Sequence, residues 1–135
     1  MIDKRQFLEW ASVYGNYYGV PKDDVSSALS RGVDTILKVD VQGAAAIKKT
    51  LPQAVFIFLM PPSTQALEQR LKRRRSESSN DLALRLATAR KEMKSLPIFD
   101  YVITSHQNKL DEVVSKIDSI VVAEKCRNKP HSVEL

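Results

Sequence analysis

Apolar and polar residues alternate along two short runs within residues 7–19, on either side of Gly15-Asn16. Alternation with a period of two predicts β-strands, because successive side chains of a strand point to opposite faces of the sheet. A Gly-Asn dipeptide between two such runs is typical of a tight hairpin turn. Residues 7–19 are therefore predicted to form a β-hairpin.

Three further runs have the composition of strands. Residues 35–40 and 101–104 are rich in β-forming side chains. Residues 54–60 are continuously apolar, which fits a strand covered on both faces. Each of these runs is predicted to be a strand of a buried sheet.

Apolar residues elsewhere recur at the three- and four-residue spacings of amphipathic helices. Residues suited to helix ends, such as Ser63 before one stripe and Pro52 after another, support these assignments. The expected helices cover about 21–32, 43–50, a segment after Ser63 that carries Leu67 and Leu71, a segment opened by Ser78 and Asp81, and 110–121. Strands that alternate with helices are typical of a parallel α/β sheet with crossover helices.

Composition supports one soluble, globular domain. The chain has 135 residues, of which 43% are hydrophobic and 27% charged. No apolar run reaches the roughly 18 residues that a membrane span needs, so no membrane partner is expected. One cysteine, Cys126, excludes an internal disulfide and argues against a zinc cage, and a cytoplasmic setting is the default expectation.

Charge indicates an anionic partner without naming it. The formal net charge is +5, and five of the basic residues lie close together within residues 70–75. Nucleic acid, nucleotides and acidic protein surfaces all fit such a cluster. Such a run is normally a solvated helix end with favourable dipole interactions.

The predicted hairpin carries side chains suited to a purine nucleotide. The Glu9 carboxylate can accept two parallel hydrogen bonds, as a guanine edge requires, although taken alone it also fits a solvated strand carboxylate. Tyr17 and Tyr18 are adjacent, so they point to opposite faces and only one of them can lie beside Glu9. Spacing does not choose between the two tyrosines. Asp40 can similarly contact a ligand or cap the helix that follows it.

Several blocks, taken together and in this order, resemble the guanylate kinases from Phe7 through about Glu124. The matching blocks are FLEWASVYGNYYG at 7–19, VDVQGA at 39–44, FLMPPS at 58–63, Arg70 with the arginines after it, Arg85, and YVIT at 101–104. The resemblance implies a P-loop kinase fold with a small nucleotide-monophosphate subdomain and a helical lid. It also implies phosphoryl transfer from ATP to GMP with Mg²⁺.

The resemblance implies a division of the chain and a set of substrate contacts. Glu9 would accept hydrogen bonds from the guanine N1–H and 2-amino group, Tyr18 would donate to the GMP phosphate beside Gly19, and Asp40 would lie near Mg²⁺ without a direct metal ligand being assigned. The implied parts of the domain at 1–126 are the GMP-binding part at 7–32, the core at 33–62 and 98–126, and the lid with its flanking helices at 63–97, followed by a tail at 127–135.

The same resemblance implies three catalytic arginines in the lid region. Arg70, Arg74 and Arg85 match family arginines that stabilise the transferring phosphoryl group. Positioned cations supply much of the rate in phosphoryl transfer, because the reaction asks little covalent chemistry of the protein. The stretch from Ser76 to Asn80 would be the tip of the lid.

Three positions depart from the family pattern. Val20 follows YYG, where the family commonly has a serine or threonine. Lys38 lies two residues before Asp40, where the family's strand often has a further aspartate. Ser105 replaces an asparagine after the last strand. These departures affect the expected contacts to GMP, to the metal region and to the ATP base.

A larger departure is that no glycine-rich phosphate loop occurs in the 135 residues. The family has a first strand followed by the loop GxxGxGK[ST], which cradles the ATP phosphates. The fold is therefore expected to lack that strand, and the chain is expected to be inactive alone. Its own N-terminal segment or another copy of the chain is an expected partner.

Two other functions are open on the sequence. One is a non-catalytic guanylate-kinase-like module that binds a protein partner, which the missing loop fits and the retained Glu9 and Tyr18 do not. The other is nucleic-acid binding through residues 70–75, for which no recognition motif is present.

Overall fold

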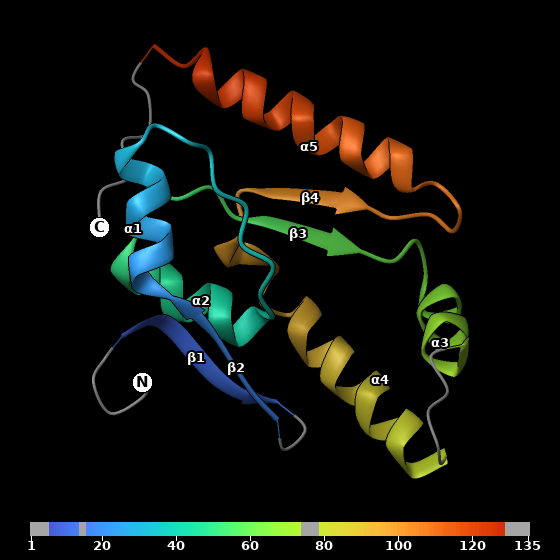
Figure 1. The fold of residues 1–135 in the computed structure, drawn as a ribbon. Coiled ribbons are helices and arrows are strands. Elements are labelled where there is room, and N and C mark those ends of the chain that lie inside the picture. The colour runs from blue at the N-terminus through green and yellow to red at the C-terminus, as the bar shows by residue number, and fades with distance from the viewer. Residues whose placement is uncertain (1–5, 14–15, 74–78, 129–135) are drawn as a thin grey trace. The chain divides into compact units, whose positions relative to one another are not determined.

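The computed structural model describes residues 6–13, 16–73 and 79–128 (Figure 1). The chain forms two compact units that divide between Ala54 and Val55. Both units mix helices with a small sheet in the described residues, which confirms the predicted α/β class.

The first unit opens with the predicted hairpin. Strand β1 (Phe7–Val13) pairs antiparallel with strand β2 (Asn16–Pro21). The register is regular from the turn as far as Glu9 and shifts between Glu9 and Phe7, as at a β-bulge. Asn16 of the predicted turn begins β2, whereas Gly15 lies outside the described residues.

Helix α1 (Lys22–Ser30) follows the hairpin directly. Pro21 precedes its first turn, where the missing N–H costs nothing because the first amides of a helix have no partner in the helix. Gly32 ends the helix in the left-handed region at φ +70°, and the Val33 N–H returns to the Ala28 carbonyl at 3.1 Å. This arrangement is a Schellman-type end, and it confirms the predicted helix.

Helix α2 (Val41–Thr50) packs against β1 and contributes Ala44 and Ile47 to the buried apolar residues of this unit. It begins two residues before the predicted start at Gly43, because Asp40 caps it. Among the residues whose side chains the structure describes, the buried hydrophobic ones of this unit are Leu8, Val25, Ala44, Ile47 and Leu51. These residues come from the hairpin, from both helices and from the residue that ends α2.

The prediction of a strand over residues 35–40 is wrong. Residues 33–40 have no regular secondary structure, and Ile36 is 78% exposed. A strand depends on the backbone groups of a neighbour, and no strand in the described part of the chain pairs with this segment. The β-forming composition of the segment is therefore not sufficient to make a strand here.

The second unit contains the predicted parallel pair. Strand β3 (Ile57–Met60) and strand β4 (Tyr101–Thr104) pair in register from Ile57 opposite Tyr101 to Met60 opposite Thr104. Strand β3 is shorter than the apolar run 54–60 that predicted it. The crossover between the strands is helical, as the sequence indicates.

Backbone hydrogen bonds continue this pairing beyond both strand ends. Before the strands, the Phe56 carbonyl accepts from the N–H of Tyr101 at 3.1 Å, and the Phe56 N–H donates to the Asp100 carboxylate at 2.7 Å. After the strands, the Ser105 N–H donates to the Met60 carbonyl at 2.7 Å. The short ladder is thus extended by two bonds before the strands and by one bond after them.

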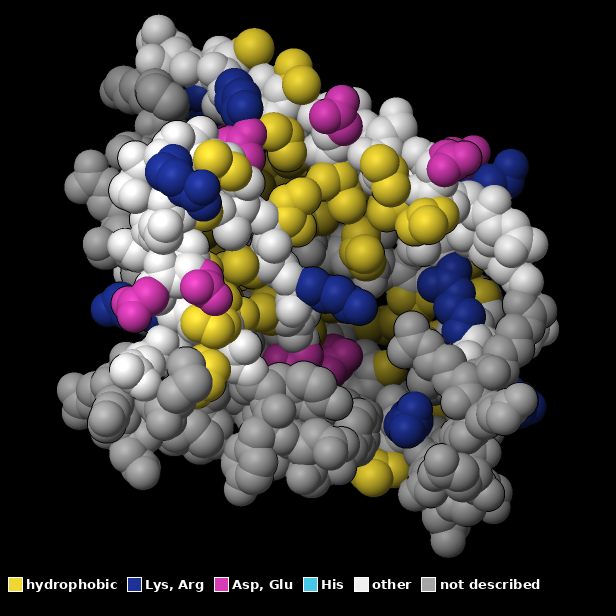
Figure 2. Space-filling view, in the orientation of Figure 1, with side chains coloured by type: hydrophobic (Ala, Val, Ile, Leu, Met, Phe, Trp, Pro, Cys, Tyr) yellow, Lys and Arg dark blue, Asp and Glu magenta, His cyan; other side chains and the backbone are white. Residues whose placement is uncertain are grey.

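The expectation that residues 54–60 are covered on both faces is wrong for one position. Leu59 is 52% exposed, although Ile103 opposite it is buried. Helix α5 (Leu110–Lys125) packs over β4, with its Val113 buried, and leaves Leu59 of the neighbouring strand open. Hydrophobic side chains are visible over this part of the second unit in Figure 2.

The remaining helices of the second unit match the sequence pattern closely. Helix α3 (Thr64–Arg73) begins after Ser63, whose hydroxyl accepts from the Ala66 N–H at 3.0 Å, as the predicted cap requires. Helix α4 (Ser79–Met93) packs against α3 and is followed by a single 3₁₀ turn, Leu96–Ile98. Ser78, the predicted start of α4, lies outside the described residues.

A polar contact joins α5 to β4. The Tyr101 hydroxyl donates to Glu124 Oε1 at 2.6 Å, and the Glu124 side chain is only 14% exposed. Arg127 Nη1 lies 3.6 Å from the same oxygen. The hydrogen bond to the carboxylate, with the partial burial of the ring, raises the pKa of Tyr101 above its usual value of about 10.

This pKa shift predicts how Tyr101 contributes to stability at high pH. A raised pKa in the folded state favours the neutral phenol, so its contribution is fully present below pH of about 10 and is lost as pH rises through the folded value. Thermal unfolding from pH 8 to pH 11 should show the wild type more stable than Tyr101→Phe at pH 8, with the difference shrinking toward pH 11. An unchanged difference over that range would contradict the assignment.

Candidate functional site

The hairpin register decides which tyrosine lies on the same side as Glu9. Glu9 pairs with Val20, and Ala11 pairs with Tyr18. Directly opposed residues of an antiparallel pair share a face, and every second residue of a strand returns to it. Positions 9 and 18 therefore share one face of the hairpin, whereas Tyr17 occupies the other face. The structure describes the backbone of these residues and not their side-chain atoms.

The irregular register lies directly beside Glu9. Two residues of β1, Phe7 and Glu9, pair with the consecutive residues Pro21 and Val20, so Leu8 is the extra residue of the bulge. Leu8 is buried among the apolar residues of this unit. Bulges often lie beside functional residues because they re-aim the neighbouring side chains. Nothing in the alternation of the sequence indicates this bulge.

Gly19 and Val20 complete the predicted site on β2. Gly19 is exposed and pairs with Trp10, and Val20 is half-buried. Because Val20 lies directly opposite Glu9, an apolar side chain is the cross-strand neighbour of the predicted guanine-reading position. Valine therefore replaces the family's hydroxyl residue at the very position that pairs with Glu9.

Asp40 caps helix α2, one of the two roles that the sequence left open. Its Oδ1 accepts from the Gly43 N–H at 2.8 Å, and its carbonyl accepts from the Ala44 N–H at 2.9 Å. The residue is half-buried. Within the described residues the second carboxylate oxygen accepts no hydrogen bond, so it remains available to another group at the positive end of the helix.

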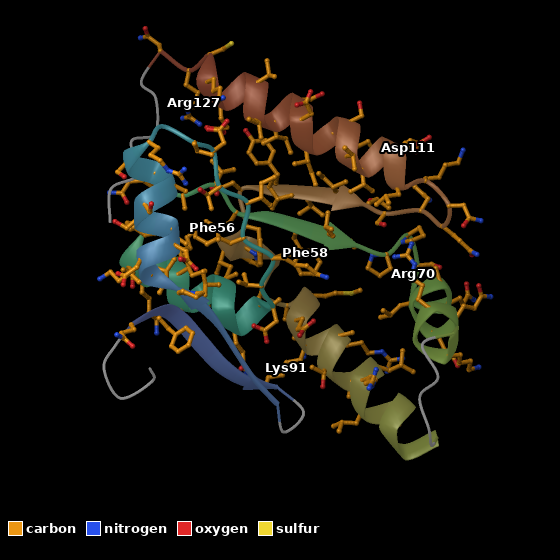
Figure 3. All side chains as sticks on the ribbon, viewed as in Figure 1. Phe56, Phe58, Arg70, Lys91, Asp111 and Arg127 are labelled. Atoms are coloured by element: carbon orange, nitrogen blue, oxygen red, sulfur yellow. The ribbon has the colours of Figure 1, made fainter. Side chains whose placement is uncertain are left out.

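The predicted arginines belong to the second unit. Arg70 extends from α3 toward the loop that follows β4, where its Nη2 donates to the Ser105 carbonyl (Figure 3). Arg85 lies on α4 and is also half-buried. Arg74 lies outside the described residues. The structure thus shows Arg70 and Arg85 on two helices that pack together.

The basic cluster in residues 70–75 is not a continuous free patch over its described part. Arg70 donates to a backbone carbonyl, and Lys72 forms an exposed ion pair with Glu68 one turn earlier, at 3.2 Å. Such a pair is typical of a solvated helix surface. The described contacts of this segment therefore give no support to nucleic-acid binding.

Sequence reasoning missed the partner of Arg70. The contact is made through the main-chain carbonyl of Ser105, and every residue type offers the same carbonyl.

Among the described residues no cluster of three or more histidine, cysteine or acidic side chains is placed to hold a metal ion. None of the helices in the described ranges is long and apolar enough to cross a membrane.

Comparison with known proteins connects these features. The family model described as guanylate kinase matches residues 1–124. A guanylate kinase of Carboxydothermus hydrogenoformans is 42% identical over 129 residues, which are 96% of this chain and 62% of that protein. A guanylate kinase of Desulfitobacterium hafniense is 44% identical over 129 residues, which are 96% of this chain and 64% of that protein.

A solved structure gives the same result for the fold. The crystal structure of guanylate kinase from Anaplasma phagocytophilum matches with a TM-score of 0.77 and 30% sequence identity, over 94% of this chain and 60% of that one. The chain thus spans about 60% of the length of the relatives that it matches. Because the family model covers nearly the whole chain and the folds agree, this chain belongs to the guanylate kinase family.

Proposed function

We propose that this chain binds GMP through its hairpin and supplies the lid arginines of a guanylate kinase, which transfers a phosphoryl group from ATP to GMP. The observation that carries the proposal is the register of β1 and β2, which assigns Glu9 and Tyr18 to one face. Relatives named guanylate kinase support it. ATP-dependent turnover is proposed for the chain together with a phosphate-binding loop, since its 135 residues contain none.

Glu9 would select guanine by matching its hydrogen-bond donors. The N1–H and the 2-amino group of guanine lie side by side, and one carboxylate can accept from both. Adenine presents an acceptor at N1, so the same carboxylate would face lone pairs and lose the hydrogen bonds that compensate its desolvation. Val20 opposite Glu9 adds no competing hydroxyl.

Tyr18 would bind the phosphate of GMP as a neutral donor. A tyrosine hydroxyl can donate a hydrogen bond to a phosphate oxygen. An anionic acceptor makes such a bond stronger than a neutral one. Gly19, which is exposed, lies next to this position.

At Asp40, Mg²⁺ would bind mainly through the phosphates of ATP rather than through a set of protein ligands. It keeps several waters and binds through substrate phosphates with one or two carboxylates. The available oxygen of Asp40 is such a carboxylate, and the described residues contain no larger acidic cluster. When bound, the ion would neutralise phosphate charge, while Asp40 would orient its water shell.

Arg70, Arg74 and Arg85 would stabilise the charge that develops on the transferring phosphoryl group. Guanidinium groups bind phosphate oxygens through two parallel hydrogen bonds and stay charged at every physiological pH. Arg85 on α4 and Arg70 on α3 are half-buried, which strengthens their interaction with an anion relative to fully solvated cations.

Replacement of Glu9 by glutamine should weaken GMP binding by about 10- to 100-fold, because an amide retains only one acceptor and loses the charge. Isothermal titration calorimetry with GMP and AMP measures the effect. The control is Asp24→Asn, which neutralises an exposed carboxylate on α1 of the same unit. Equal affinity of the wild type for GMP and AMP would refute the role of Glu9. Capture of a protein partner without any GMP binding would favour the non-catalytic module.

The two tyrosines of β2 provide a matched pair of variants. Tyr18→Phe should lower GMP affinity by about 10-fold through the lost phosphate hydrogen bond and leave guanosine affinity unchanged. Tyr17→Phe should change neither affinity, because position 17 lies on the other face of the hairpin. The reverse result, with Tyr17→Phe as the weaker binder, would show that the assigned face is wrong.

Asp40 can be tested by separating its cap from its charge. Asp40→Ala should cost about 1 kcal/mol of stability, measured by urea unfolding, because α2 loses its cap. Asp40→Asn retains a cap and should stay within a few tenths of a kcal/mol of the wild type. If the charge orients Mg²⁺, Asp40→Asn should reduce the Mg²⁺ dependence of nucleotide binding although its stability is nearly that of the wild type. Unchanged dependence in that variant would limit Asp40 to capping.

A further inference from the structure

The β-bulge at Leu8 is bounded by paired backbone on both sides. Toward the turn, the register of the hairpin is regular. On the other side, Phe7 pairs with Pro21, and the Lys22 N–H donates to the Gln6 carbonyl at 2.9 Å. If the register of the turn continued unchanged, Lys22 would lie opposite Phe7 instead. The hydrogen bond therefore extends the shifted register, so the bulge is a defined insertion and not the frayed end of a strand.

The extra residue of the bulge has an apolar anchor. Leu8 is only 9% exposed, and Phe7 beside it is half-buried. Both helices of the first unit pack against the hairpin, α2 on β1 and α1 on β2. Burial of a leucine side chain is favourable, and it holds the inserted residue on the core side of the hairpin.

The bulge changes which residues share a face with Glu9. A shift of one residue moves every later side chain of a strand to the other face. In a regular strand, Phe7 would share the face of Glu9, because it lies two residues away. In the observed register Phe7 pairs with Pro21, which lies on the opposite face from Val20, the partner of Glu9. Glu9 is therefore the last position of β1 on its own face.

This arrangement leaves room for a base beside position 9. Two residues of a strand span roughly 6.6 Å, so a phenylalanine on the same face would lie within reach of a purine that Glu9 holds by its edge. The shifted register places the ring of Phe7 on the other face, where the hairpin meets the rest of the unit. The insertion thus removes a steric competitor without changing the residue that reads the base.

We propose that Leu8 is a positioning residue for guanine recognition: its burial holds the bulge, and the bulge keeps Phe7 off the face that carries Glu9 and Tyr18. This inference rests on the proposed GMP site and adds a residue that does not touch the nucleotide. Because Leu8 acts through the placement of Glu9, its replacement should change which base is preferred and not only how tightly any nucleotide binds.

Isothermal titration calorimetry of the full chain with GMP and inosine monophosphate (IMP) tests the inference. IMP keeps the N1–H and the phosphate but lacks the 2-amino group, so the ratio of the two affinities reports the second hydrogen bond to Glu9. The parent should favour GMP by about 10-fold. A variant that is only partly folded binds both nucleotides more weakly by the same factor, which leaves the ratio unchanged. The ratio therefore separates positioning from stability.

Leu8→Ala releases the anchor and should lower the ratio to about 3-fold or less, whereas Leu8→Met conserves the side-chain volume and should keep the parent ratio. The control Val25→Ala truncates a buried residue on α1 of the same unit and should also keep it. Amide exchange at Lys22 reports the bulge directly and should be faster in Leu8→Ala than in the other variants. If Leu8→Ala does not fold, the smaller truncation Leu8→Val replaces it.

Two kinds of failure can be told apart. A folded Leu8 truncation with the parent ratio, or an equal fall of the ratio in Val25→Ala, overturns the inference and leaves the proposed function standing. A parent that does not bind GMP, or that binds GMP and IMP equally, refutes the guanine contact of Glu9 itself and the inference with it.

Discussion

Extended backbone must find hydrogen-bonding partners, and both units of this chain depend on how that requirement is met. In the first unit, β1 and β2 satisfy each other across a short turn. In the second unit, β3 and β4 come from segments 44 positions apart in the sequence. The crossover helices α3 and α4 lie between these two strands along the chain. Residues 33–40 find no strand partner in the described part of the chain and remain irregular.

The same pairing places the functional positions. The regular part of the hairpin register brings positions 9 and 18 to one face, and the bulge begins only beyond Glu9. In the second unit, the ladder bond between Ser105 and Met60 places the carbonyl that receives Arg70. In each unit the functional groups therefore depend on backbone pairing, because the register of the strands fixes the positions of these groups.

Local patterns in the sequence predicted the elements whose pattern lies within a short stretch of the chain. The hairpin, the Ser63 cap of α3 and helix α5 follow from patterns among neighbouring residues, and all three are present. The strand predicted at residues 35–40 failed because a strand depends on a distant partner that composition does not reveal. The Arg70 contact was beyond prediction for a related reason: its acceptor is a main-chain carbonyl. The choice of Tyr18 over Tyr17 needed a register that alternation alone leaves open.

Recognition of guanine by one face of the hairpin is the central claim, and amide chemical shifts during titration of the isotope-labelled chain with GMP test it most directly. The predicted result is a saturable change at Glu9, Ala11 and Tyr18 through Val20, with AMP producing little change at the same positions. Changes confined to other elements, or equal changes with AMP, would contradict the claim.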